Sequence, residues 1–194
     1  LRNIFTLLKG TVAAQLIGIV ALPVLTRLFP PEAFGSYQIF ISVLTVLMAG
    51  GALRYDLAMF QVSDDRDLAV ILRLSLLGTI AIAILVLVAC LGLRLAGASW
   101  FIEREPAIWL LPAAMALAGF LQTIGYLPTR MKQFSLSARA KVVQVMGYVL
   151  SGLGIGLVAP FAGGLVVSDL VGRIMSLGVL GAWWQRTQSS LFIP

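Results

Sequence analysis

Charged residues divide the chain into long uncharged segments that are predominantly apolar. The first four of these segments are residues 10–26, 33–53, 74–93 and 106–129. A helix rises about 1.5 Å per residue, so roughly 20 residues cross a hydrocarbon core of about 30 Å. Each of the four segments therefore predicts one transmembrane helix.

A fifth uncharged segment, residues 142–168, is too long for one ordinary span. Pro160 and the pair Gly163–Gly164 are typical of a tight turn, after which a sixth helix follows. Pro23 and Pro112 lie inside helices one and four and predict kinks there. The chain is therefore predicted to be an all-α integral membrane protein, a single six-helix bundle over residues 1–194. Its helices are expected at about 10–28, 36–54, 68–94, 106–129, 141–160 and 164–185.

Composition supports a membrane protein. Apolar residues make up 60% of the chain and charged residues 11%, whereas a soluble domain has about 45–50% apolar and about 25% charged residues. The mean hydropathy is +1.00. These values exclude an ordinary soluble enzyme.

The basic residues indicate an orientation. Lys and Arg total 14 against 8 Asp and Glu, but they lie singly or in small groups between apolar segments, which argues against a nucleic-acid partner. With the N-terminus in the cytoplasm, three basic residues, Arg27, Arg94 and Arg104, fall outside. This strong positive-inside bias predicts that both ends of the chain are cytoplasmic. The ten basic residues on that side are Arg2, Lys9, Arg54, Arg66, Arg73, Arg130, Lys132, Arg139, Lys141 and Arg186.

Residues suited to catalysis or metal binding are scarce. The chain has no histidine and one cysteine, Cys90, so it has neither imidazole ligands nor an internal disulfide. The acidic residues of segment 64–67 are interpreted as a helix cap and a charged loop rather than a metal site. Gly152, Gly154 and Gly156 are interpreted as helix-packing positions rather than a nucleotide loop. We expect no enzyme activity, no cofactor and no metal.

The sixth helix combines a small-residue ridge with two charges. Asp169 and Arg173 are four residues apart, a spacing that allows an ion pair along the helix. Charges inside a span are costly and normally face a bundle interior or a water-filled cavity. Two interpretations remain: a self-neutralised structural pair, or an Arg that lines a route for an anion. The ridge, predicted to be a packing face, consists of Gly164, Ser168, Gly172 and Ser176.

Two stretches near the N-terminus resemble a known family. They are LPVLTRLFPPEAFGSYQIFISVL at residues 22–44 and ALRYDLAMFQVSDD at residues 52–65. The match is most specific over residues 26–29, 31–32, 34–35 and 53–56, and after about residue 70 only helix count and loop placement agree. The chain thus resembles the polysaccharide biosynthesis, or O-antigen flippase, family. That family belongs to the multidrug/oligosaccharidyl-lipid/polysaccharide superfamily, with the toxic-compound exporters and lipid II flippases.

The resemblance implies a transporter of two six-helix lobes around a cavity that opens to either side of a bacterial cytoplasmic membrane. This chain would be the N-terminal lobe, and because it begins at Leu1 and stops at Pro194 we expect it to be a piece that lacks the second lobe. The implied substrate is an oligosaccharide linked to polyprenyl pyrophosphate. Arginine suits phosphate geometrically, so we expect Arg173, Arg54 and Arg27 to contact the anionic head group.

Other functions are weighed against this one. A multidrug or cation antiporter lobe of the same superfamily would favour buried carboxylates, and Asp169 is the one candidate. A membrane glycosyltransferase or ligase needs large exposed loops, which this pattern does not predict. A truncated remnant without transport activity stays open, and Arg54 is equally well explained as a cytoplasmic anchor.

Overall fold

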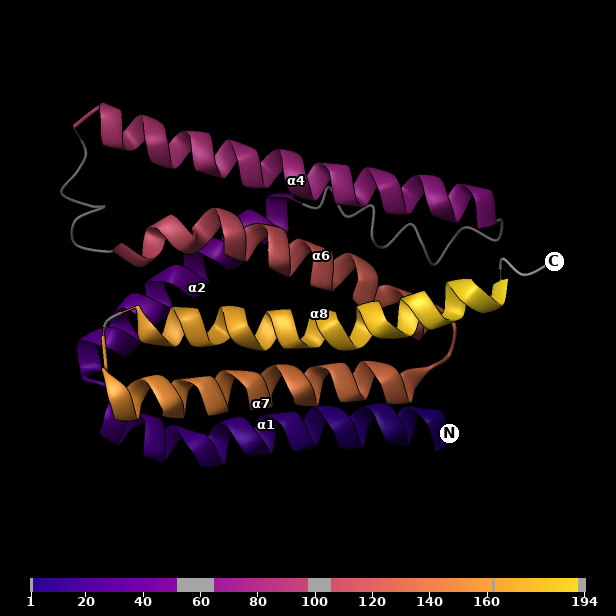
Figure 1. Ribbon diagram of the computed structural model, residues 1–194, viewed down its shortest axis with the longest axis horizontal. Coiled ribbons are helices and arrows are strands. Elements are labelled where there is room, and N and C mark those ends of the chain that lie inside the picture. Colours follow the sequence, from indigo (N-terminus) through magenta and orange to yellow (C-terminus); the bar gives the residue numbers. More distant parts are fainter. Residues whose placement is uncertain (1, 52–64, 98–105, 162, 192–194) are drawn as a thin grey trace.

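The computed structural model describes residues 2–51, 65–97, 106–161 and 163–191, which form helices and turns with no strand among them (Figure 1). Within these residues, six helices are long and apolar enough to cross a membrane, as the sequence predicts. The chain is therefore an all-helical, multi-pass membrane protein. The elements are α1 (Arg2–Leu28), α2 (Pro31–Gly51), α4 (Asp65–Leu95), the short 3₁₀ helix η1 (Pro106–Leu110), α6 (Leu111–Arg130), α7 (Phe134–Val158) and α8 (Gly164–Leu191).

Several helices extend beyond their expected bounds. α7 begins at Phe134 rather than at Lys141, so Lys141 lies two turns inside the helix. α1 begins at Arg2, and α2 begins at Pro31, where a proline without an N–H costs nothing in the first helical turn. The expectations were wrong here because charges mark the edge of the hydrocarbon layer, not the end of a helix. The expected end of the second helix, residues 52–54, lies outside the described residues.

The fourth span is divided in a way that the sequence analysis did not predict. Its first turn is the 3₁₀ helix η1, and α6 starts at Leu111. Pro112 therefore stands at the start of α6 rather than in a helix interior, so the expected kink within the helix is replaced by a change of helix type. Pro23 does lie inside α1, and Pro128 lies inside α6.

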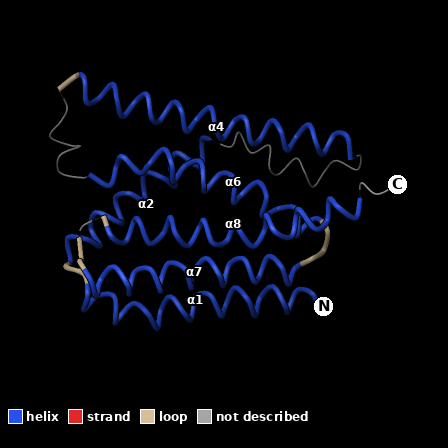
Figure 2. The backbone as a smooth tube through the Cα atoms, in the orientation of Figure 1, coloured by secondary structure: helices blue, strands red, loops and turns tan. Residues whose placement is uncertain are grey.

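The helices form a bundle in which α1, α7 and α8 lie side by side (Figures 1 and 2). α8 also contacts α6 and α2, and α4 packs chiefly on α6 at the other side of the bundle. The start of α1, the α6–α7 turn and the end of α8 lie at one end of the bundle, which we call the terminal end. The α1–α2 and α7–α8 connections lie at the opposite end.

Small residues bring α7 and α8 into close contact. Gly172 lies against the backbone of Gln144 and Tyr148, where any Cβ would collide with the carbonyl oxygen of Gln144. One turn along α8, Ser176 Oγ donates a 3.0 Å hydrogen bond to the carbonyl of Ala140 on α7. Gly164 packs against Phe29 and Ile155 at the other end of the ridge. The ridge of α8 is thus a packing face, which confirms that prediction.

Candidate functional site

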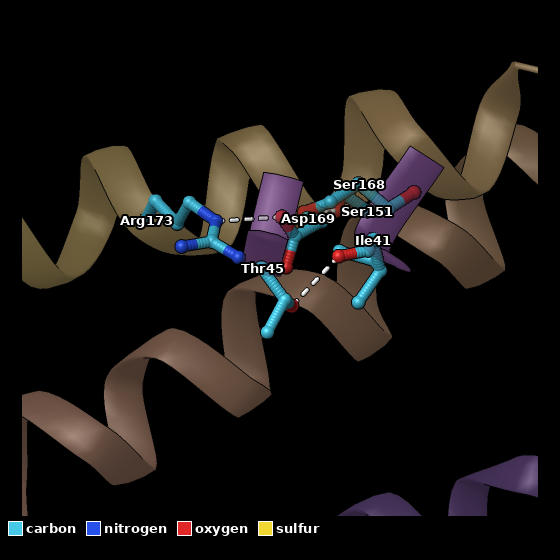
Figure 3. Close-up of polar contacts among 6 residues, drawn as sticks. All are labelled: Ile41, Thr45, Ser151, Ser168, Asp169 and Arg173. Atoms are coloured by element: carbon cyan, nitrogen blue, oxygen red, sulfur yellow. Dashed lines mark hydrogen bonds and ion pairs between the residues drawn. The ribbon is translucent and has the colours of Figure 1, made fainter. Parts of the chain in front are cut away.

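An ion pair lies in the first half of α8. Arg173 Nε donates to Asp169 Oδ2 at 2.6 Å, and the two side chains are 16% and 11% exposed, respectively (Figure 3). Arg173 is nine residues from the start of α8, roughly 13 Å along the axis. The pairing expected from the spacing of four is therefore present, at mid-span depth.

The ion pair uses only part of the hydrogen-bonding capacity of Arg173. A guanidinium has five N–H donors in a planar fork, and Asp169 accepts from Nε. Among the residues that the structure describes, the two terminal nitrogens of Arg173 have no hydrogen-bond partner. The fork of Arg173 is thus neutralised by a neighbouring carboxylate and still able to bind an anion.

Arg173 lines a cavity of about 330 Å³ between α2, α6, α7 and α8. Thr45 of α2 lies on its wall, but the Thr45 hydroxyl donates to the carbonyl of Ile41 at 2.7 Å, within its own helix (Figure 3). The polar side chains that α6 and α7 contribute are Gln122 and Gln144. Among the described residues of this lining, Arg173 is the one charged side chain, and Asp169, which lies next to it outside the lining, balances its charge.

Two tyrosines bring polar groups from neighbouring helices close to the ion pair. The rings of Tyr37 on α2 and Tyr148 on α7 stack with their centroids 5.9 Å apart. The carboxylate of Asp169 interacts electrostatically with both tyrosines. Next to them, Ser151 Oγ donates to the carbonyl of Gly147 at 2.5 Å and lies 3.4 Å from the carbonyl of Ser168 on α8. Asp169 is therefore fixed in a polar setting shared by three helices.

A second cavity, of about 360 Å³, lies between α6, α7 and α8 on the side of the terminal end. It shares Leu121, Gln122 and Gln144 with the Arg173 cavity, so the two cavities adjoin, and together they are called the groove. Lys141 lines it and, within the described part of the chain, has no ion-pair partner. The polar residues lining this second cavity are Gln122, Tyr126, Thr129, Ser137, Lys141, Gln144 and Ser176.

The groove was missed by the sequence analysis, although a signal for it exists. Polar residues recur every three or four positions within three apolar helices, which places them on one face of each helix. The uncharged segment after Lys141 predicts that the fifth helix starts at residue 141, which places Lys141 at the end of a helix rather than inside it. The stripes are Gln122, Tyr126 and Thr129 on α6, Ser137, Lys141 and Gln144 on α7, and Asp169, Arg173 and Ser176 on α8.

The other residues expected at the site are not brought to the groove. Arg27 is exposed in the last turn of α1, at the end of the bundle opposite the terminal end, and it lines neither cavity. Arg54 lies outside the described residues. Cys90 is a buried free thiol on α4. Within the described residues, no group of three or more His, Cys, Asp or Glu side chains is placed to hold a metal ion.

The fold and the groove together define a class: a multi-pass helical membrane protein with a polar groove that is lined by Arg173 and Lys141. Comparison of the chain with known protein families, curated protein sequences and solved structures finds no match. The groove is therefore the basis on which a function is assigned.

Proposed function

We propose that the chain is the N-terminal lobe of a transporter that flips an oligosaccharide linked to polyprenyl pyrophosphate across the bacterial cytoplasmic membrane by alternating access. The observation that carries this proposal is the fork of Arg173, which lies at mid-span and faces a cavity with its two terminal nitrogens unpaired among the described residues. The resemblance of residues 22–44 and 52–65 to the O-antigen flippase family supports the same function.

The energetics of Arg173 suit an anion that crosses the membrane. An unpaired charge at the centre of a span costs about 2.5–3.5 kcal/mol on insertion scales, and Asp169 offsets this cost when no ligand is bound. A pyrophosphate is an acceptor that arginine binds through two parallel hydrogen bonds. The two terminal nitrogens of Arg173 can bind the pyrophosphate while Nε stays paired with Asp169, so the charge of Arg173 is never left without a partner.

The groove runs toward one end of the bundle, and this direction suggests how the pyrophosphate head group would reach Arg173. The groove continues from Arg173 past Gln144 to Lys141, toward the terminal end. The positive-inside bias assigns this end to the cytoplasm, which is where the lipid-linked oligosaccharide would be loaded. On this proposal the lobe works with a second lobe of the same protein and catalyses no covalent reaction.

One observation favours a second candidate, a lobe of a multidrug or cation antiporter. Asp169 is a carboxylate residue inside the membrane span with a whole-residue exposure of 8%, and such a group can bind a cation. Its ion pair with Arg173 lowers its attraction for a second cation, so we place this function below the flippase. The two candidates differ in the charge of the ligand that the groove binds.

The test is a binding measurement on the chain in phosphatidylcholine nanodiscs. Polyprenyl pyrophosphate, the uncharged polyprenol and a lipophilic organic cation serve as probes. We expect the unchanged chain to bind the pyrophosphate. Arg173→Ala should weaken this binding by at least tenfold, because a hydrogen bond to a charged group contributes about 1.5–3 kcal/mol. Arg173→Lys should weaken the binding less. Binding of the cation in place of the pyrophosphate would favour the antiporter. If the chain binds neither charged probe, both functions are contradicted, and the remaining interpretation is a truncated remnant without transport activity.

A further inference from the structure

The cavity between α6, α7 and α8 has an unusually polar lining for a membrane bundle, and it reaches the surface at Lys141, which is exposed. Its wall contains hydroxyl, amide and ammonium groups, which alternate with small and apolar residues such as Gly125, Ala140 and Leu180. In a low-dielectric bundle each buried polar group is costly unless it is hydrogen-bonded. A concentration of such groups around one cavity therefore indicates a polar occupant.

Some of these groups already have partners within the protein. Ser176 donates to the carbonyl of Ala140, and Thr129 and Ser137 share one hydrogen bond of 3.3 Å between their hydroxyl oxygens. By contrast, the amide of Gln144 and the ammonium of Lys141 have no hydrogen-bond or ion-pair partner among the described residues. The shared Thr129–Ser137 bond leaves a second hydroxyl hydrogen and several acceptor lone pairs free for a ligand.

The cavity adjoins the one that Arg173 lines. Gly172 lies against the backbone of Gln144, so the Gln144 side chain begins at nearly the same depth as Arg173. Lys141 and Ser137 follow one and two turns farther toward the terminal end, at about 5.4 Å per turn. An anionic group held by Arg173 would therefore have the next part of its molecule within reach of Gln144, Thr129 and Ser137.

The composition of the lining matches a sugar ring. A sugar hydroxyl both donates and accepts, and amide and hydroxyl side chains do the same. Leu121, Leu180 and Gly125 add apolar groups to the lining, which suit the C–H bonds of a ring. The described residues of the lining include no carboxylate, so they neither repel an anionic ligand nor suit a divalent cation. The volume of about 360 Å³ lies at the lower end of the ~300–1,000 Å³ range of small-molecule pockets.

We propose that the α6–α7–α8 cavity is the subsite for the sugar attached directly to the pyrophosphate, with Gln144, Thr129 and Ser137 contacting its hydroxyls while Arg173 holds the phosphate. This proposal rests on the proposed function and adds the part of the substrate that the cavity recognises. It makes these three side chains determinants of sugar selectivity.

The experiment compares two lipids in phosphatidylcholine nanodiscs: polyprenyl pyrophosphate, and the same lipid carrying a single N-acetylhexosamine. Gln144→Met and the double variant Thr129→Val with Ser137→Ala remove the polar contacts at nearly constant volume. Matched controls are Gln38→Met and Thr26→Val, on the exposed faces of α2 and α1. We expect the cavity variants to bind the glycosylated lipid about three- to tenfold more weakly, as for lost uncharged hydrogen bonds. The affinity of the Thr129→Val with Ser137→Ala variant for the sugar-free lipid is expected to be unchanged, which also shows that this variant is folded. Gln144 also lines the Arg173 cavity, so Gln144→Met is expected to weaken both lipids, and the glycosylated lipid more.

Each other outcome has a defined meaning. If the cavity variants weaken both lipids equally, or neither, the sugar subsite is refuted while phosphate binding by the lobe stands. A nucleotide carrying the same sugar that binds as tightly as the glycosylated lipid would also overturn the proposal, since the sugar would then come from a soluble donor. If the unchanged chain binds neither lipid, the proposed function fails and this subsite fails with it.

Discussion

Gly172 of α8 lies directly against the carbonyl oxygen of Gln144 of α7, so the two helices are in backbone contact at the depth where Arg173 follows in the chain. This contact fixes two things at once. It joins α7 to α8, and it places Gln144 in the lining of the same cavity as Arg173. The position of the groove thus depends on a glycine that has no part in binding.

Gly172→Ala should destabilise the bundle. The added methyl group would meet main-chain atoms that cannot move independently, and overpacking of this kind costs about 1–3 kcal/mol. The matched control is Gly178→Ala on the same helix, where a Cβ meets open space and alanine favours the helix. The measurement is thermal unfolding in detergent, followed by circular dichroism. Equal stability of the two variants would show that the α7–α8 contact is not tight.

The two halves of the ion pair should differ in their effect on stability. Asp169→Ala leaves Arg173 charged, because a guanidinium does not lose its proton in proteins, and we expect a loss of about 3 kcal/mol. Arg173→Ala leaves a carboxylate that can take up a proton, so we expect a smaller loss. Amounts of membrane-inserted protein and unfolding in detergent measure both. A larger loss for Arg173→Ala would mean that the guanidinium is required mainly for structure.

The orientation of the bundle is tested with single cysteines. In a Cys90→Ala background, Ala96→Cys after α4 should react with an impermeant thiol reagent added from outside, because the terminal end is expected in the cytoplasm. Ser135→Cys, exposed near the start of α7, should react only after the membrane is opened. The reverse labelling pattern would place the terminal end outside the cell. The substrate would then enter the groove from the external side.

The sequence predicted the number of helices and the ion pair for simple physical reasons. The thickness of the hydrocarbon layer determines the length of an apolar segment, and a spacing of four places Asp169 and Arg173 on one side of α8. Helix ends were less predictable, because the long side chain of Lys141 can reach polar surroundings from inside a helix. The packing of α1 on α7 was not predictable either, since the lipid-facing and helix-facing sides of an apolar helix have similar composition.

The same limitation explains why the site was only half identified. Arg173 was recognised because an isolated charge inside a span is conspicuous. Gln122 and Gln144 are uncharged, and only the arrangement of α6, α7 and α8 brings them together around one groove. Arg27 was expected at the site on the basis of its residue type, yet its helix ends on the side of the bundle away from the terminal end.

The central claim is that Arg173 contacts the pyrophosphate, and transport by Arg173 variants tests it most directly. In the transporter that contains this lobe, expressed in a strain whose own flippase is deleted, the measurement is the amount of surface polysaccharide relative to the amount of inserted protein. We expect Arg173→Ala to abolish transport at near-normal protein levels, and Arg173→Lys to restore part of it, because lysine keeps the charge without the planar fork. The double variant Asp169→Ala with Arg173→Ala, which removes both charges, is expected to be as inactive as Arg173→Ala. Normal transport by the double variant would contradict the account, because the pair would then have served only to neutralise itself.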